Sequence, residues 1–183
     1  MKIILATLSL VFLIYLLAPG PTSINDFPSL PNSLKSTEEG DTIQVPNVAG
    51  YFSNSYRSFA TNFYRGIYQS KTIFPFPPLR LNYPPEFAFS AIKDQTHSTY
   101  LEEFVYPLRD SLFVNGWEPF EEVTKKPRYQ GATPFEPGGK SFETKVTLRY
   151  YPSPLWARIL VWLGINISLM LVWTVGKKAF KYG

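Results

Sequence analysis

Two apolar segments bracket the chain, and they constrain its architecture more than any other feature. They are Ile3–Ala18 and Leu155–Val175. The second has 21 residues, or about 31 Å of helix at about 1.5 Å per residue, which matches a hydrocarbon core of about 30 Å. The first is shorter and follows Lys2, so it reads as a retained signal anchor or a removed signal peptide. Pro21 would directly follow the best cleavage position, which is unfavourable for cleavage and favours the retained anchor.

Charge orients these two predicted transmembrane helices. The tails outside them carry Lys2, Lys177, Lys178 and Lys181 and no acid, which accounts for the whole net charge of +4. Cytoplasmic flanks of membrane spans are enriched in Lys and Arg. We therefore expect an integral membrane protein with both termini cytoplasmic and residues 21–154 outside. The nearly neutral exported part argues against nucleic acid as a partner.

Five side chains are predicted to mark the membrane boundaries of the second segment. Trp156 and Trp173 are about 25 Å apart along a helix, which places one indole near each interface, where lipid headgroups are the expected contact. Arg158 can extend to the outer headgroups. Lys177 and Lys178 follow the apolar run on the inner side.

Three small or polar residues in the same segment suggest helix packing. Asn166 is near the middle of the segment, where polar groups are costly and are usually satisfied by a neighbouring helix. Gly164 and Ser168 lie one turn apart and allow close helix approach. They are either tolerated in a lone helix or mark contact with the first segment, a second copy or another membrane protein.

The region between the spans is long enough for one small domain of α+β class. Cysteine is absent, so core packing has to hold the fold without disulfides. We expect two to three helices and a short antiparallel sheet, exported between the two membrane helices. The predicted divisions are an anchor at 1–18, a Pro/Ser-rich tether at 19–47 with an edge strand at 42–45, the domain at 48–152, the second span at 155–175 and a basic cytoplasmic tail at 176–183.

Hydrophobic spacing predicts the elements of this domain. A helical stripe indicates a helix over 50–69 whose buried face is Phe52, Tyr56, Phe59, Phe63 and Ile67. A proline-rich connector follows over 71–85, and a second helix is expected from Pro85 or Glu86 to about Gln95.

The next stretch is ambiguous. Residues 98–116 have helical spacing with a kink at Pro107, but they also alternate as a strand does. The kinked helix is favoured. Residues 142–150 alternate with period two and predict a half-buried strand, with its partner expected within 117–130.

Candidate chemical groups are sparse. Asp94, His97 and Ser98 contain the residue types of a serine-hydrolase triad, but neighbours in one turn diverge instead of converging. One His and no Cys leave little for a metal site. The acidic doublets Glu102-Glu103 and Glu121-Glu122 are interpreted as solvated faces rather than a glycosidase pair. We expect no catalytic, cofactor-binding or metal-binding residues.

Aromatic residues leave one further choice. Trp117, Tyr106, Tyr129 and Tyr83 could form a stacking surface or belong to the core, and the core is favoured. The expected function is a non-enzymatic membrane-anchored protein, a structural or accessory component of a membrane or cell-envelope complex. The alternative is a displayed binding module for cell-wall glycan or peptide. A concave aromatic cleft would favour the module, and a flat apolar patch would favour the component.

Overall fold

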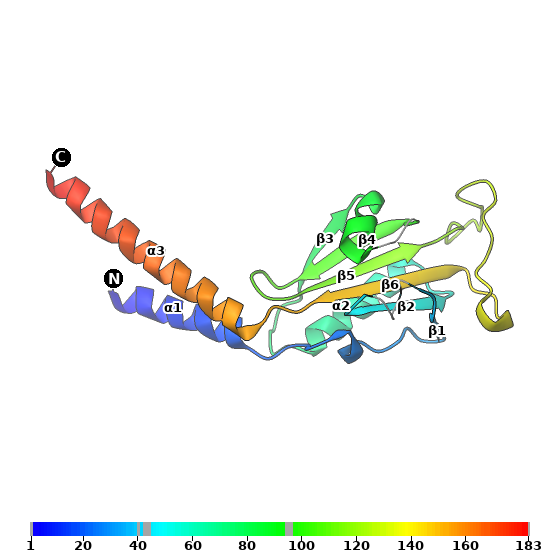
Figure 1. Ribbon diagram of the computed structural model, residues 1–183, viewed down its shortest axis with the longest axis horizontal. Coiled ribbons are helices and arrows are strands. Elements are labelled where there is room, and N and C mark those ends of the chain that lie inside the picture. The colour runs from blue at the N-terminus through cyan, green and yellow to red at the C-terminus, as the bar shows by residue number, and fades with distance from the viewer. Residues whose placement is uncertain (1, 40, 42–44, 94–96, 183) are drawn as a thin grey trace. The chain divides into compact units, whose positions relative to one another are not determined.

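The chain is divided into two compact units. The computed structural model describes residues 2–39, 41, 45–93 and 97–182. The helical unit contains Met1–Pro19 and Ser153–Gly183, and the sheet unit contains Gly20–Pro152. Figure 1 shows the elements of each unit along the chain.

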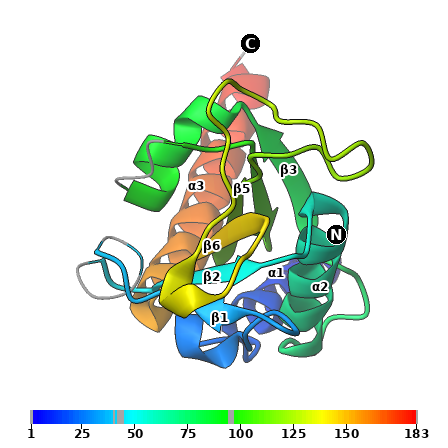
Figure 2. The ribbon, with the colours of Figure 1, turned by 90° about the vertical axis from the view of Figure 1, so that its right-hand side faces the viewer.

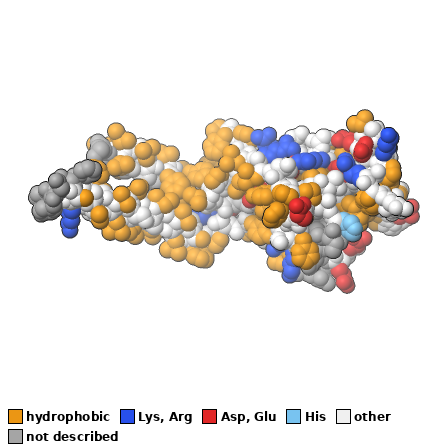
Figure 3. All heavy atoms as spheres, turned by 90° about the horizontal axis from the view of Figure 1, so that it is seen from above, with side chains coloured by type: hydrophobic (Ala, Val, Ile, Leu, Met, Phe, Trp, Pro, Cys, Tyr) orange, Lys and Arg blue, Asp and Glu red, His pale blue; other side chains and the backbone are white. Residues whose placement is uncertain are grey.

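The helical unit has one helix that can cross a membrane by length and composition. Helix α3 spans Leu155–Tyr182, and its apolar part is Leu155–Ala179. Figure 3 shows hydrophobic side chains over most of the visible surface of this unit. Helix α1, Lys2–Leu17, has an apolar run of only Ile3–Leu17, so the described residues do not confirm the second predicted span. The predicted basic tail is not separate, since α3 continues through it.

Helices α1 and α3 pair in antiparallel fashion. Ser9 Oγ donates a hydrogen bond to Asn166 Oδ1 at 2.7 Å, and Trp162 Nε1 donates to the carbonyl of Ser9 at 3.0 Å. Farther along, Arg158 Nη1 donates to the carbonyl of Leu16 at 3.2 Å. Position along α1 therefore rises as position along α3 falls. Asn166 therefore accepts a hydrogen bond from α1 at Oδ1, while its Nδ2 donates to the carbonyl of Trp162 within α3 at 2.7 Å.

The other residues singled out in this segment lie on open surface. A side chain added at Gly164 would have no described atom within 4 Å, and Ser168 is exposed. Trp156 and Trp173 are exposed, and the Lys177 amine lies 4.9 Å from the ring centre of Trp173. Lys178 is also exposed, and Arg158 Nε donates to the carbonyl of Ser153. The Gly164 face is thus distinct from the contact with α1.

The sheet unit is built on one antiparallel sheet. Six strands occur among the described residues, in the order β1-β2-β6-β5-β4-β3. Their bounds are β1 Leu34–Lys35, β2 Val48–Ser53, β3 Leu79–Tyr83, β4 Tyr100–Val105, β5 Ser111–Trp117 and β6 Thr144–Tyr151. The α+β class with an antiparallel sheet is confirmed, and the sheet is larger than the short one expected.

Strand β6 is the predicted 142–150 strand, but its strand partners lie outside 117–130 except for Trp117, the last residue of β5, which is opposite Lys145. It lies between β2 and β5, with Leu148 opposite Ala49 on one side and Val114 on the other. Both faces of this central strand are covered, so most of its residues are buried and not only alternate ones. The region beyond β5 forms a long loop instead of a strand.

The kinked helix over 98–116 is wrong, because these residues form the hairpin of β4 and β5. Pro107 lies in the connecting turn, where the missing N–H costs no ladder bond. Leu108 has a φ of 61°, and the amide of Tyr106 donates to the carbonyl of Asp110 to close the turn. The strand-like alternation of these residues, the less favoured alternative, is the pattern that the structure follows.

Helix α2, Arg57–Ser70, covers one face of the sheet and begins later than predicted. Its buried face is Ala60, Thr61, Tyr64 and Tyr68. The predicted stripe is only partly correct: residues 48–53 form β2 instead of the first helical turns, whereas Phe63 and Ile67 are partly buried against the core. Phe59 is 48% exposed and stacks on Phe63 at a ring distance of 5.9 Å. The small side chain of Ala60 lets the helix approach the sheet while the two tyrosines fill the core.

The segment predicted to be a flexible tether is instead part of the fold. Ile24, in the short helical turn η1 (Ile24–Asp26), packs with Phe27 and Leu30 in the same core as α2. Farther along, Lys145 on β6 binds the carboxylate of Asp41 at 2.8 Å, and Asp41 is buried. Apolar residues spaced between prolines are enough to dock a chain that has little regular structure.

Residues 42–44 of the edge strand predicted at 42–45 lie outside the described residues. Val45 is buried. The strand at this edge of the sheet is β1, whose Leu34 is opposite Phe52 of β2.

Short helical turns cover the opposite face of the sheet (Figure 2). They are η2, Pro85–Phe87, and η3, Phe89–Lys93, with a further turn η4 at Pro137–Gly139 in the loop before β6. Ala88 and Ile92 pack on Leu101 of β4 in a second, smaller core. The helix predicted from 85 to 95 is thus helical turns up to 93, and residues 94–95 lie outside the described residues.

Candidate functional site

A shallow pocket of about 280 Å³ lies at one end of the sheet. It is formed where the chain enters β4, where it leaves β5, and by the loop that follows β5. Its lining residues are His97, Ser98, Thr99, Trp117, Glu118, Arg128 and Tyr129. The volume is slightly below the range of about 300–1,000 Å³ typical of small-molecule sites, so it suits one small group.

Aromatic rings form one wall of this pocket. The His97 ring stacks on Trp117 with centres 4.6 Å apart and planes 12° apart. Phe135 meets Trp117 edge-on at 4.9 Å, and Trp117 Nε1 donates a hydrogen bond to Tyr129 Oη at 3.2 Å. These contacts hold the indole in one orientation, which reduces the entropy that a ligand has to overcome on binding.

The four aromatic residues considered from sequence divide into two groups. Trp117 and Tyr129 line the pocket, and Tyr129 is exposed. Tyr106 is buried in the main core, as favoured, and Tyr83 packs against the smaller core. His97 stacks on Trp117, whereas Ser98 Oγ donates to Asn115 Oδ1 at 2.6 Å. His97 and Ser98 thus engage different groups, and Asp94 lies outside the described residues.

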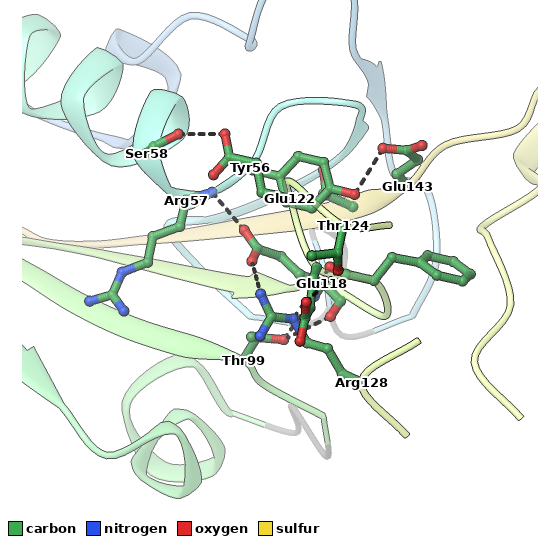
Figure 4. A network of polar contacts seen from close by, with 12 residues as sticks. Tyr56, Arg57, Ser58, Thr99, Glu118, Glu122, Thr124, Arg128 and Glu143 are labelled. Carbon is green, nitrogen blue, oxygen red and sulfur yellow. Dashed lines mark hydrogen bonds and ion pairs between the residues drawn. The ribbon is translucent and has the colours of Figure 1, made fainter. Parts of the chain in front are cut away.

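Glu118 is the polar centre of the site (Figure 4). Its side chain is buried and accepts a hydrogen bond from the backbone amide of Arg57, the first residue of α2, at 2.6 Å. It therefore acts as a cap for a helix whose N-cap residue, Tyr56, supplies no side-chain bond. Thr99 Oγ1 accepts from the Glu118 amide at 2.8 Å, and Arg128 Nη2 lies 3.5 Å from the carboxylate.

The loop over residues 118–143 is held to the domain by further polar contacts. Tyr56 Oη donates to Glu143 Oε2 at 2.8 Å (Figure 4). Lys125 also binds that carboxylate. The bond from Lys125 lowers the pKa of Glu143 below its usual value. Ser58 Oγ donates to Glu122 Oε1 at 2.8 Å. Long connections without regular structure are uncommon in compact domains and are usually functional when ordered.

A second ionic cluster joins α2 to the far edge of the sheet. Glu102 is fully buried and binds Arg57 Nε at 2.7 Å and Arg80 Nε at 2.6 Å. The guanidinium of Arg57 also lies 5.3 Å from the ring centre of Tyr100. With both arginines bound to it, Glu102 is placed to hold helix and strand together.

The interpretation of the acidic doublets as solvated faces is therefore wrong for Glu102. Its neighbour Glu103 points to the other face of β4, where it accepts a hydrogen bond from Tyr83 Oη at 2.6 Å. Neighbours on a strand face opposite ways, so one doublet cannot supply two cooperating carboxylates. Glu122 is exposed, in keeping with the expected solvated face.

No grouping of three or more His, Asp or Glu that could hold a metal ion occurs within the described ranges. Comparison with known proteins finds no relative: no protein-family model matches the chain, and no curated protein sequence and no solved structure shows significant similarity.

Glu118 is expected to make stability depend on pH. Burial is the main reason that its pKa is raised above the reference value of 4.5. A raised pKa in the fold means that protonation favours the fold: this contribution is complete below pH 4.5 and is lost as pH rises through the higher folded pKa. Glu118→Gln removes the titration, so its free energy of unfolding should improve relative to wild type as pH rises through that window. Urea unfolding across pH measures the difference, and a constant difference would contradict the assignment.

Proposed function

We propose that the protein is a non-enzymatic, membrane-anchored binding module that presents its sheet unit outside the cell membrane. The observation that carries this proposal is the Trp117 pocket, in which aromatic rings and polar groups converge on a space for one small group. Concave aromatic sites with a few placed polar groups are the usual form of ligand sites. The ligand class that we propose is cell-wall glycan or peptide.

The ligand would be a small, flat and partly polar group. Trp117, His97 and Tyr129 offer ring surface, while Arg128 supplies a cation and a side chain that is 38% exposed. The carboxylate of Glu118 is already engaged by the Arg57 amide. A sugar ring with an N-acetyl group, or a peptide side chain with an acid beside it, fits this combination.

A titration of the full-length protein in detergent tests the proposal. Trp117 is the only tryptophan between the two apolar segments, so a 5-fluorotryptophan label reports on the pocket by fluorine NMR. The resonance, assigned with Trp117→Phe, should shift and saturate with an N-acetylated cell-wall disaccharide, with or without its stem peptide. The sugar alone and the peptide alone separate the two ligand classes. An unmoved resonance at millimolar concentrations of every probe would defeat the proposal.

Two matched variants sharpen this test. Tyr129→Ala removes one aromatic wall and should weaken binding by about two- to tenfold, since an aromatic contact contributes about 0.5–1.5 kcal/mol. Val123→Ala lies in the same loop, is 90% exposed and does not line the pocket. Its affinity should equal that of wild type.

We further propose that α1 and α3 together form a two-helix anchor, with both termini cytoplasmic and residues 21–154 outside. The charged tails support this orientation. The pairing of Ser9 with Asn166 supports retention of α1, because its removal would leave the carbonyl oxygen Oδ1 of Asn166 without the hydrogen bond that it accepts from Ser9. Lipid is then a direct partner of the exposed apolar surface of α3.

Cysteine labelling in intact cells tests this topology. Because the sequence contains no cysteine, only the introduced thiol can react. Single cysteines at Ser70 and Lys140, which are both exposed, should react with an impermeant thiol reagent. A cysteine at Ala179 near the end of α3 should react only after the cells are permeabilised. Reaction at Ala179 with protection at the other two positions would reverse the orientation.

The second candidate function is an accessory component of a membrane or envelope complex. It is favoured by the exposed face of α3 that carries Gly164 and Ser168, which α1 leaves uncovered. Two results together would favour this candidate over the binding module. The ligand titration would give no shift of the Trp117 resonance, and a defined set of partner proteins would co-purify in mild detergent with wild type but not with Gly164→Leu.

A further inference from the structure

The outer edge of β3 is open. Strand β3 ends the sheet order and pairs with β4, with Leu81 opposite Glu103, and no strand lies beyond it in the part of the chain that the structure describes. An edge strand presents a row of backbone N–H and C=O groups to any strand that can reach it. The opposite edge is formed by β1, which has only two residues.

The side chains of β3 leave this edge unprotected. Leu79 is 56% exposed and Leu81 is 41% exposed, on the same face of the strand. Natural edge strands are commonly guarded by charges that repel a second strand. The one charge on β3 belongs to Arg80, which donates two hydrogen bonds to the buried carboxylate of Glu102. That guanidinium is thus turned toward β4, where it shares the Glu102 carboxylate with Arg57.

We propose that β3 pairs in antiparallel fashion with β3 of a second copy of the protein, joining the two sheets across a two-fold axis. In the register centred on Leu81, the two Leu81 residues are opposite each other. Leu79 is then opposite Tyr83 of the second copy, and Arg80 is opposite Asn82. Apolar residues meet apolar residues on one face, polar residues meet on the other, and no like charges are opposed.

The surrounding sequence limits this association to a dimer. Pro78 and Pro84 flank the strand directly, and proline lacks the N–H needed to extend a ladder. A two-fold pairing uses the same edge in both copies, so it closes on itself. The two-residue strand β1 is too short to continue the sheet at the other edge.

A five-residue pairing is weak when the copies are free in solution. It buries far less than the roughly 1,200–2,000 Å² of stable protein complexes. Confinement to one surface raises the effective concentration and populates such contacts. This last step rests on the proposed membrane anchoring, whereas the pairing itself rests only on β3.

Single cysteines in full-length protein reconstituted into phosphatidylcholine vesicles test the register. Leu81→Cys places two thiols directly opposite, close to the separation that a disulfide needs. Leu79→Cys places them four residues apart along the strands, about 14 Å. Under mild oxidation, Leu81→Cys should give at least ten times more disulfide dimer than Leu79→Cys. Equal yields, or no dimer from either at any density, would overturn the proposal.

A charge variant supplies an independent readout without a disulfide. Copies labelled with donor or acceptor dye at Lys140→Cys should show energy transfer in vesicles. Leu81→Lys opposes two positive charges at the axis and should reduce the transfer specific to dimers by more than fivefold, whereas Leu34→Lys on β1 should not. Sheet circular dichroism confirms that both variants fold. Energy transfer that is unchanged by Leu81→Lys would exclude the edge of β3 as the contact between the two copies. The ligand titration of the Trp117 pocket is measured in dilute detergent and does not depend on dimer formation. If no ligand binds there, the energy-transfer test of the β3 pairing still stands.

Discussion

Replacing Glu102 with glutamine is expected to lower the free energy of unfolding by about 2–4 kcal/mol. The substitution keeps the size of a fully buried side chain but removes the charge that Arg57 and Arg80 both bind. Hydrogen bonds to charged groups contribute about 1.5–3 kcal/mol each. The arginine side chains are 39% and 41% exposed, so water recovers part of the loss. Urea unfolding of the full-length protein in detergent, followed by the circular dichroism of the sheet, measures the change.

Glu103→Gln is the matched control for this prediction. Glu103 is the next residue on β4, but it lies on the opposite face and is only partly buried. A glutamine there can still accept the bond from Tyr83 Oη. Its cost should stay below about 1 kcal/mol. Equal costs at positions 102 and 103 would mean that the two arginines do not hold Glu102 as described.

Tyr64→Ala should cost about 3–5 kcal/mol, the usual range for truncating a large buried aromatic side chain. Tyr64 is fully buried between α2 and the sheet. Phe59→Ala, on the outer side of the same helix, should cost less than about 1.5 kcal/mol, because Phe59 is half exposed and loses mainly its stacking on Phe63. The same unfolding measurement compares them. If Phe59→Ala lowered the free energy of unfolding more than Tyr64→Ala does, the buried face of α2 would be the one that the spacing of phenylalanines predicts.

The parts of the fold that could be predicted are those with a long, unbroken pattern. Strand β6 follows from strict alternation over residues 142–150, and both apolar segments form helices. The hairpin of β4 and β5 was missed because Tyr100, Phe104 and Leu108 also satisfy helical spacing. The pairing of β4 with β3 and of β5 with β6 settles the conflict. A local pattern carries no information about those distant partners.

The candidate site was less accessible to prediction, because its parts are distant along the chain. Glu118 caps the helix that begins 61 positions earlier, and no sequence signal links the two. Trp117 and Tyr129 stand out in the sequence as aromatic residues, but composition does not distinguish a core position from a pocket wall. Burial of Glu102 depends on the strand that replaces the expected helix, since only the strand turns Glu102 and Glu103 to opposite faces.

The hydrogen bond from Tyr150 Oη to the carbonyl of Pro21, at 2.7 Å, places the beginning and the end of the sheet unit side by side. The bond between Arg158 and Leu16 does the same for the two helices of the other unit. A domain whose first and last residues lie close together can be inserted between two paired helices without separating them. The chain is therefore organised as a helical hairpin whose connecting segment is a folded domain. A change confined to the loops of this domain leaves the pairing of the two helices untouched, because the hydrogen bonds of Ser9 and Leu16 with α3 lie wholly within the helical unit.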